Sequence, residues 1–320
     1  MTIAVAGGGA FGTALAIALA LDGKRVTLWA RNADAVSTMN ATRQNPRLPH
    51  VKLPDEISVT HDLADLFAAD IILLATPAQT LRGFLQDNAA HLAQKSLIAC
   101  CKGIDLTTMT GPVTTIQDVV PSAVAGILTG PSFAADIARG RPTALTLACA
   151  NEDLSIDLQA ELSTPTLRIY RTTDTTGAEL GGALKNVMAI VCGVCMGAGL
   201  GESARAAVIT RGFAEMKRLA DALGAERTTL NGLSGFGDLV LTCTSDQSRN
   251  YRFGLAIGSG KPFDTSTTVE GAATAQAVQK LAKTLSIEMP ICTVAADLCV
   301  DKTDVATAVK MLLSRPLKEE

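Results

Sequence analysis

The sequence predicts an α/β domain followed by an all-α domain. Up to about residue 171, short β-rich runs alternate with helical stretches, which is typical of a doubly wound sheet with helices on both faces. The runs are nearly all apolar, as expected for parallel strands that are buried on both sides. After residue 175 the strand signals fade and helical patterns take over. We therefore expect two domains, 1–174 and 175–320, with the active site between them.

The pattern also places each expected element along the chain. The expected strands are Thr2–Ala6, Val26–Trp29, Ile71–Ala75, Leu97–Cys101, Val124–Leu128, Ala144–Cys149 and Leu167–Tyr170. The expected helices of the second domain are Gly177–Met196, Ser203–Leu223, Arg249–Ile257, Ala272–Leu285 and Cys292–Val300. The segment Asn45–Pro54 holds three prolines, which predicts an exposed loop.

Composition narrows the class of protein. The 320 residues are 48% apolar, 18% charged and 3% aromatic, which indicates a globular chain with an aliphatic core. The net charge of −3 gives no basic field for nucleic acid or an anionic membrane, so an anionic ligand must be held by local cations.

The apolar segments indicate neither a signal peptide nor a membrane span. The N-terminal segment has no Lys or Arg before Lys24, so it lacks the basic start of a signal peptide. The longest apolar run, Val187–Leu200, falls short of the ~20 residues of a membrane span. We expect a cytoplasmic protein without membrane insertion, in which the eight cysteines are free thiols. Cys192 and Cys195 have CxxC spacing, but two core cysteines on one helix explain them better than a redox or metal site.

A glycine-rich turn predicts a dinucleotide site. Residues 7–12, GGGAFG, fit G-x-G-x-x-G, follow an expected strand and open an expected helix, with another strand after it. Gly7 permits the tight turn, Gly9 lets the backbone approach a pyrophosphate, and Gly12 allows close packing of helix and strand. The helix N-terminus supplies N–H donors to the phosphates.

The end of the second strand bears on the choice of dinucleotide. NAD-specific folds usually place Asp or Glu about 20 residues after the glycines, whereas this chain has Arg31, nineteen positions past Gly12. Arginine suits a 2′-phosphate, so NADP(H) is favoured and NAD(H) remains possible. The competing interpretation is a solvated arginine that begins the next helix.

Other strand ends carry polar or glycine residues. Lys102 follows the strand at Leu97–Cys101, and Gly130-Pro131-Ser132 follows the strand at Val124–Leu128. Carboxyl ends of parallel strands share one edge, where ligands of open α/β sheets bind. A lysine on this edge is more consistent with facing an anion or a carbonyl than with an ordinary surface position.

The second domain contains a lysine in an unusually apolar helix. Gly177–Gly201 has two charged residues, Glu179 and Lys185, which are too far apart for an i,i+4 pair. A buried lysine loses hydration of its charged form, which suits it to acid/base work. The neighbouring Asn186 and the absence of histidine in this half favour function over a lysine that merely extends to solvent.

Two further polar groups follow in the second domain. Gly232, Gly235 and Gly237 bring Asp238 in close, and Ser248-Arg249-Asn250 begins a helix. A hydroxyl, a guanidinium and an amide at a helix start form a good receptor for a phosphate dianion. The structural alternative is that Ser248 is a plain N-cap and Arg249 is solvated.

These segments together resemble the NAD(P)-dependent glycerol-3-phosphate dehydrogenases, and their bacterial, GpsA-like branch best. The matching segments, in order, are GGGAFGTALA, Lys102-Gly103, GPSFA, GGALKNVMAI, ARAAVITRGFAEM, GDLVLTC, SRNYRFG and VEG. The resemblance implies a Rossmann domain joined to a helical domain of the 6-phosphogluconate-dehydrogenase C-terminal type. It also implies reduction of dihydroxyacetone phosphate to sn-glycerol 3-phosphate for phospholipid synthesis.

The resemblance assigns roles residue by residue. Lys185 is implied as the general acid/base, with Lys102 and Asp238 completing the catalytic group. The implied substrate residues also include Gly130, Ser132, Asn186, Thr242, Ser248, Arg249 and Asn250. The implied cofactor contacts are Ala10, Phe11, Arg31, Lys102, Ala134, Arg249 and Glu270. Val191 departs from the small residue usual at its position, which affects local helix packing and not the chemistry.

Two rival functions remain open at this stage. A β-hydroxyacid dehydrogenase shares this architecture, but its G-x-x-x-K-x-x-x-N pattern has Ala189 here in place of Asn, and a carboxylate substrate leaves Ser248-Arg249-Asn250 unexplained. A regulator that binds NADPH without turnover does not account for Lys102, Lys185 and Asp238. The expected partner is a small-molecule substrate, with no metal and with a homodimer left open.

Overall fold

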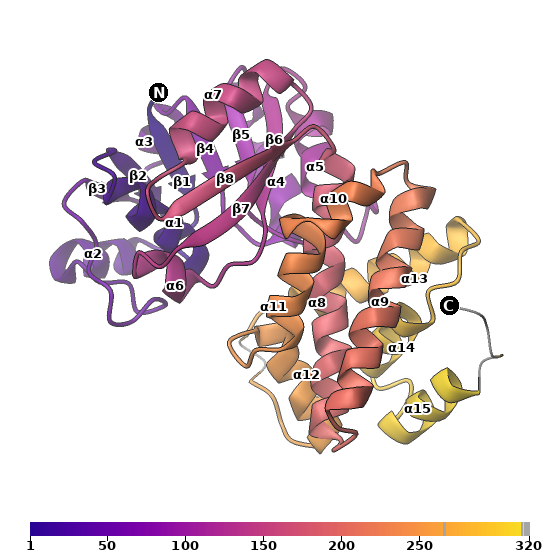
Figure 1. Ribbon diagram of the computed structural model, residues 1–320. Helices are drawn as coiled ribbons and strands as arrows, with labels where there is room; N and C mark the ends of the chain where they lie inside the picture. The colour runs from indigo at the N-terminus through magenta and orange to yellow at the C-terminus, as the bar shows by residue number, and fades with distance from the viewer. Residues whose placement is uncertain (265–266, 315, 317–320) are drawn as a thin grey trace. The chain divides into compact units, whose positions relative to one another are not determined.

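The computed structural model describes residues 1–264, 267–314 and 316 and divides into two compact units (Figure 1). The first unit contains Met1–Lys102 and Thr110–Glu179, and the second contains Gly103–Met109 and Leu180–Glu320.

The first unit is built on one eight-stranded sheet with the order β3-β2-β1-β4-β5-β6-β7-β8. Its strands are β1 (Ile3–Ala6), β2 (Val26–Trp29), β3 (Ile57–Thr60), β4 (Ile71–Leu74), β5 (Ser96–Ala99), β6 (Val124–Thr129), β7 (Thr143–Cys149) and β8 (Leu167–Thr172). Its helices are α1 (Ala10–Ala20), α2 (Ala33–Thr42), α3 (Leu63–Phe67), α4 (Ala78–Leu92), α5 (Pro112–Val119), α6 (Ala134–Ala138) and α7 (Glu152–Leu162). The predicted doubly wound sheet is confirmed.

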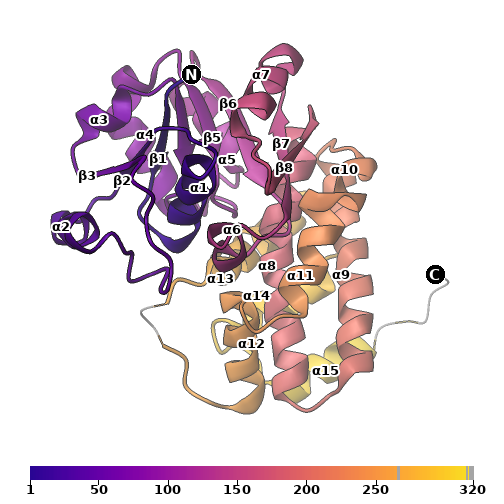
Figure 2. The ribbon, with the colours of Figure 1, turned by 60° about the vertical axis from the view of Figure 1, so that its left-hand side comes forward.

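The sheet is buried on both faces because successive strand residues point in opposite directions. In β1, Ile3 and Val5 join the core under α1, α2, α6 and α7, whereas Ala4 and Ala6 join the core under α3, α4 and α5. Figure 2 shows α1 beside the strands. This two-sided burial explains why the strands read as continuous apolar runs.

The structure corrects three sequence predictions. Strand β3 was not expected; its burial alternates, because it lies at the edge of the sheet. Strand β7 runs antiparallel to β6, so the sheet is not entirely parallel. The segment Asn45–Pro54 is a loop, but it is not fully exposed, because Asn45, Leu48 and Leu53 are buried.

The second unit is helical throughout its described elements. They are most of α8 (Thr175–Gly197), then α9 (Glu202–Ala222), α10 (Arg227–Asn231), the π-helix η1 (Leu233–Gly237), α11 (Asp238–Cys243), α12 (Arg249–Ser259), α13 (Glu270–Thr284), α14 (Pro290–Leu298) and α15 (Val305–Leu313). The predicted all-α region is confirmed, with α10, η1, α11 and α15 as additions. Figure 1 shows α9 running along α8.

Helix α8 is the centre of this unit's core. Its 23 residues make it longer than the apolar run Val187–Leu200 that the sequence shows. Among the described helices, it alone is long and apolar enough to cross a membrane. However, 89% of its most apolar window is buried inside the protein. That environment is the one a core helix has. Val191 is buried in the same core.

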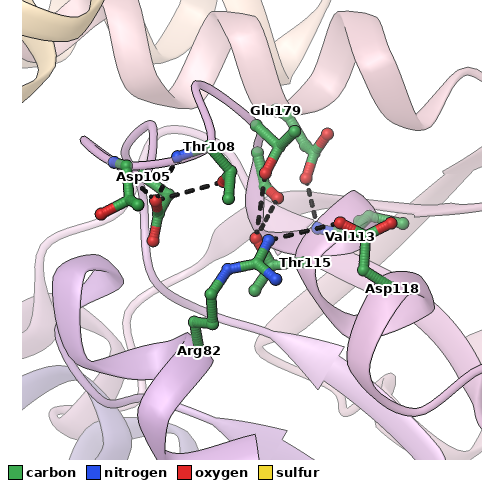
Figure 3. A network of polar contacts seen from close by, with 10 residues as sticks. Arg82, Asp105, Thr108, Val113, Thr115, Asp118 and Glu179 are labelled. Carbon is green, nitrogen blue, oxygen red and sulfur yellow. Dashed lines mark hydrogen bonds and ion pairs between the residues drawn. The ribbon is translucent and has the colours of Figure 1, made fainter. Parts of the chain in front are cut away.

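Two buried glutamates cap helices that lack a cap of their own. Helices α5 and α14 both begin with proline and have no side-chain cap, so their first N–H groups need partners from elsewhere. Glu215 on α9 accepts hydrogen bonds from the N–H groups of Ile291 (2.7 Å) and Cys292 (3.1 Å). Glu179 likewise accepts from the N–H of Val113 on α5 (Figure 3).

The pKa values of these two carboxyl groups are raised because the groups are buried. Burial raises the pKa of Glu179 to about 8, and the hydrogen bond from Val113 opposes that rise. Burial also raises the pKa of Glu215, against the hydrogen bonds from Ile291 and Cys292.

Candidate active site

The glycine-rich turn between β1 and α1 has the geometry of a dinucleotide-binding turn. Gly7 has a φ of +136°, and a Cβ there would lie 2.6 Å from the carbonyl oxygen of Ala75. A Cβ on Gly12 would lie 2.2 Å from the Gly7 carbonyl oxygen and 3.1 Å from Val5, so helix and strand pack closely there. A Cβ on Gly9 would meet no atom within 4 Å, so the space beside this backbone is open. Glycine is therefore required at Gly7 and Gly12 for packing, whereas Gly9 leaves its backbone accessible.

Four predicted site residues come together in the first unit. Lys102 Nζ donates to the Gly130 carbonyl at 3.3 Å and lies 5.9 Å from the centre of the Phe11 ring. Ser132 Oγ donates to the same carbonyl at 3.1 Å. Gly130 has a φ of +140°, a conformation that favours glycine. The edge of the sheet thus holds an ammonium, a hydroxyl and an aromatic ring in one group.

The remaining predicted cofactor residues of this unit lie at element boundaries. Arg31 is exposed just after β2, while its neighbour Asn32, not Arg31, caps α2. Ala10 is the first residue of α1, and Ala134 is the first residue of α6.

In the second unit, Lys185 and Asp238 form a buried ion pair. Lys185 Nζ on α8 lies 2.5 Å from Asp238 Oδ1 on α11, and the two side chains are 8% and 0% exposed. Thr242 Oγ1, one turn further along α11, donates to the same carboxylate oxygen at 3.3 Å. The structure brings these three predicted residues together. They form a buried polar cluster inside an apolar core.

The π-helix before Asp238 depends on glycines. A Cβ on Gly181 of α8 would lie 2.3 Å from the Ser234 carbonyl oxygen, and a Cβ on Gly235 would lie 2.0 Å from that of Leu230. Helix α8 therefore contacts the backbone of η1 directly. Single-turn π-helices are frequent at functional sites, and this one sets the start of α11 at Asp238.

A chain of amides links three helices that carry predicted residues. Asn250 Nδ2 on α12 donates to Asn186 Oδ1 on α8 at 2.9 Å, and the N–H of Gly271 on α13 donates to Asn250 Oδ1 at 2.9 Å. Asn186 is the neighbour of Lys185, and Gly271 is the neighbour of Glu270, the first residue of α13. This chain fixes the start of α12 against α8 and α13.

Helices α8 and α12 cross with their backbones in contact. The glycines at the crossing share small size: a Cβ on any of them would lie 1.9–2.3 Å from a carbonyl oxygen of the other helix. They are Gly193 and Gly197 on α8, and Gly254 and Gly258 on α12. These residues were not predicted from the sequence, although their two G-x-x-x-G spacings are a signal for such a crossing.

The phosphate receptor predicted at the start of α12 is partly structural. Ser248 is the N-cap of α12, and its Oγ accepts a hydrogen bond from the Tyr251 N–H at 3.2 Å. Arg249 is exposed at the first position of the helix. Ser248 therefore caps the helix, as the structural alternative expects, and the charge of Arg249 is exposed at the same helix end.

The CxxC cysteines do not form a disulfide. The eight cysteines are free, and the thiol of Cys243 on α11 donates a hydrogen bond to Cys192. Burial raises the pKa of Cys195 to about 11 and that of Cys243 well above its ordinary value. A raised pKa disfavours the reactive thiolate. Among the described residues, no cluster of three His, Cys, Asp or Glu side chains is placed to hold a metal.

Two family models match the chain along most of its length. The N-terminus of NAD-dependent glycerol-3-phosphate dehydrogenase matches residues 2–155, and the C-terminus of the same enzyme matches residues 174–310. The chain belongs to the NAD-dependent glycerol-3-phosphate dehydrogenase family.

Relatives of the family support this over the full length. A glycerol-3-phosphate dehydrogenase (NAD(P)+) of Paracoccus denitrificans is 58% identical over 320 residues, which is all of both chains. The crystal structure of glycerol-3-phosphate dehydrogenase from Coxiella burnetii has a TM-score of 0.93 and 36% identity, and covers 98% of this chain and 99% of that one. A D-mandelate dehydrogenase shares the fold alone, with a TM-score of 0.64 and 19% identity over 94% of this chain and 98% of that one.

Proposed function

We propose that the protein catalyses the reversible NAD(P)H-dependent reduction of dihydroxyacetone phosphate to sn-glycerol 3-phosphate, which supplies glycerophospholipid synthesis. The proposal is supported by the sequence identity to a glycerol-3-phosphate dehydrogenase, which is 58% over the full length of the chain, and by the two family models. The observation that carries it is the buried pair of Lys185 and Asp238 on neighbouring helices.

Lys185 is proposed as the general acid/base. Its ammonium is buried and paired, so it is held at one position with a proton to give. When the C2 ketone is reduced, negative charge develops on its oxygen, and Lys185 would stabilise that charge and donate the proton. Asp238 would balance the charge of Lys185 while the substrate is absent, and Thr242 would fix the orientation of Asp238.

Lys102 is proposed as the second cation of the catalytic group. Its ammonium donates to Gly130, beside Ser132, so these three residues offer donors and a carbonyl to a small polar substrate. Arg249 is proposed to bind the remote phosphate, because a guanidinium pairs with phosphate oxygens in a bidentate way. Asn186 and Asn250 would hold α12 in place for that contact.

The residues present fit a nicotinamide dinucleotide. The open space beside Gly9, at the N-terminus of α1, suits a pyrophosphate, and Ala10, Phe11, Arg31, Lys102, Ala134, Arg249 and Glu270 are the residues proposed to contact the rest. A bound dinucleotide supplies the hydride. The exposed guanidinium of Arg31 would favour a 2′-phosphate, and hence NADPH over NADH.

The wider setting is proposed from the same reasoning. Residues 1–174 would form the dinucleotide domain and residues 175–320 the substrate domain, in a cytoplasmic protein that works without a metal. A homodimer is compatible with this function but not required by it.

The test is steady-state turnover of the wild-type protein, followed by the absorbance of the reduced nicotinamide. Dihydroxyacetone phosphate should be reduced, with NADPH giving the higher kcat/KM. A 2-keto acid should not be reduced at a comparable rate. Binding of NADPH without turnover of any substrate would instead support the nucleotide-sensing regulator.

A further inference from the structure

The loop after α2 reaches back to the glycine-rich turn through one buried amide. Asn45 is 4% exposed, and its Nδ2 donates to the Gly8 carbonyl at 3.1 Å and to Thr13 Oγ1 at 2.7 Å. Its Oδ1 accepts the N–H of Arg47 at 2.9 Å. Both amide protons and the amide oxygen are therefore satisfied, and they bridge the turn, the first turn of α1 and the loop.

The bond to Gly8 bears on the atom that a dinucleotide needs. The peptide group joining Gly8 to Gly9 is planar and trans, so its carbonyl and the N–H of Gly9 point in opposite directions. Fixing the Gly8 carbonyl therefore fixes the direction of the Gly9 N–H. Gly9 is also the position where a Cβ would meet no atom within 4 Å, so the space beside this residue at the helix start is open.

Close packing also restricts the position of Gly8. A Cβ on Gly8 would lie 2.7 Å from the Cβ of Ala30, so the turn lies tightly against the end of β2. The same amide of Asn45 contacts Thr13, which is fully buried and whose N–H donates to the Gly9 carbonyl at 3.0 Å. Asn45 thus contacts the structure on both sides of the Gly9 residue.

The loop that carries Asn45 is itself anchored, so the amide is a fixed donor. Arg43 donates to the Ile57 carbonyl at 3.1 Å and also to the Pro54 carbonyl. The N–H of Leu53 donates to the Arg43 carbonyl at 2.8 Å, and Leu53 is buried. The backbone at both ends of the loop is thereby held against the sheet.

We propose that Asn45 is a positioning residue of the dinucleotide site. Its amide orients the Gly8–Gly9 peptide and the first turn of α1, so that the Gly9 N–H is aimed at the pyrophosphate before the dinucleotide binds. Asn45 acts through Gly9 and not by contact with the dinucleotide. This inference rests on the proposed function only in that the turn binds a dinucleotide.

The experiment compares Asn45→Ala and Asn45→Asp with a matched amide on the preceding helix. Asn40 on α2 donates a hydrogen bond to the Val59 carbonyl at 3.1 Å and provides the control variant Asn40→Ala. Dissociation constants for NADPH and NADH are measured by titration of nicotinamide fluorescence without substrate. Asn45→Asp keeps the size and the acceptor for Arg47 but replaces both donors with a carboxylate oxygen, so it provides a second variant without the two bonds if Asn45→Ala folds poorly.

Both Asn45 variants should weaken NADPH and NADH alike, by roughly tenfold, because the pyrophosphate is common to the two. The KM for dihydroxyacetone phosphate and kcat at saturating dinucleotide should stay within about twofold of wild type. Unchanged dissociation constants, a loss equal to that of Asn40→Ala, or a loss confined to NADPH would each overturn the proposal. Failure of the proposed function would appear separately, as wild-type binding of dinucleotide without turnover of dihydroxyacetone phosphate.

Discussion

The ammonium of Lys185 lies 2.5 Å from the carboxylate of Asp238, and both groups are enclosed by the helical core. Removing one partner of a buried ion pair leaves the other charge uncompensated, which costs about 3–5 kcal/mol. This pairing therefore couples the stability of the second unit to its proposed chemistry.

Asp238→Ala should lower both stability and turnover. We expect a loss of about 3–5 kcal/mol in unfolding free energy and a fall in kcat, because the Lys185 charge is left buried without a partner. Asp238→Asn should lose less stability, since its amide oxygen still accepts from Lys185. Denaturant unfolding and steady-state kinetics check this. An Asp238→Ala variant as stable and active as wild type would show that the pair is dispensable.

Arg31→Asp should discriminate between the two dinucleotides. The NADPH affinity should fall by up to the roughly 1.5–3 kcal/mol of a charge-assisted hydrogen bond, reduced because Arg31 is exposed. NADH should be unaffected or improved. Arg25→Asp, at the opposite end of β2, removes the same charge from an exposed site and serves as the control. Equal responses of both dinucleotides would mean that Arg31 does not read the 2′-phosphate.

Arg249→Ala should separate phosphate recognition from chemistry. The KM for dihydroxyacetone phosphate should rise strongly, with some fall in kcat, because remote binding energy helps to orient the ketone. The loss of kcat/KM should be much smaller with dihydroxyacetone, and Arg249→Lys should recover activity only in part. Arg252→Ala, an exposed arginine on the same helix, is the control. Equal fractional losses on both substrates would place the phosphate pocket elsewhere.

Glu179→Gln should change how stability depends on pH. Because folding raises the pKa of Glu179 to about 8, the folded protein binds more protons than the unfolded chain between about pH 4.5 and pH 8. The contribution of Glu179 to stability is thus present below this window and is lost as the pH rises through it. The thermal midpoint of Glu179→Gln relative to wild type should therefore increase from pH 5.5 to pH 8.5. A constant difference across that range contradicts the prediction.

The fold could be predicted from the sequence where apolar runs are long, and not where the signal is short. Strand β3 contributes only Ile57 and Val59 to the core, so its run is too brief to stand out. Apolar composition also carries no strand direction, which is why the antiparallel pairing of β6 with β7 was missed. The short helix α11 follows several glycines. Because glycines are typical of loops, this helix was not predicted.

For the site, residue types could be predicted but partners could not. Lys185 stood out as a cation in an apolar helix, yet its pairing with Asp238 joins residues 53 positions apart and depends on the packing of α8 against η1 and α11. The role of Asn45 could not be predicted, because a polar residue in a proline-rich segment is expected to be exposed. Its role depends on a bond to Gly8, across 37 positions.

The measurement that tests the central claim most directly is kcat for Lys185→Ala, alongside its dissociation constant for NADPH. Lys280→Ala, an exposed lysine on α13, is the matched control. We predict that kcat for dihydroxyacetone phosphate falls by about 10²–10⁴ in Lys185→Ala, as for a lost general acid, while NADPH binds within about twofold of wild type. A folded Lys185→Ala variant with near-normal kcat would contradict the assignment of Lys185 as the acid/base.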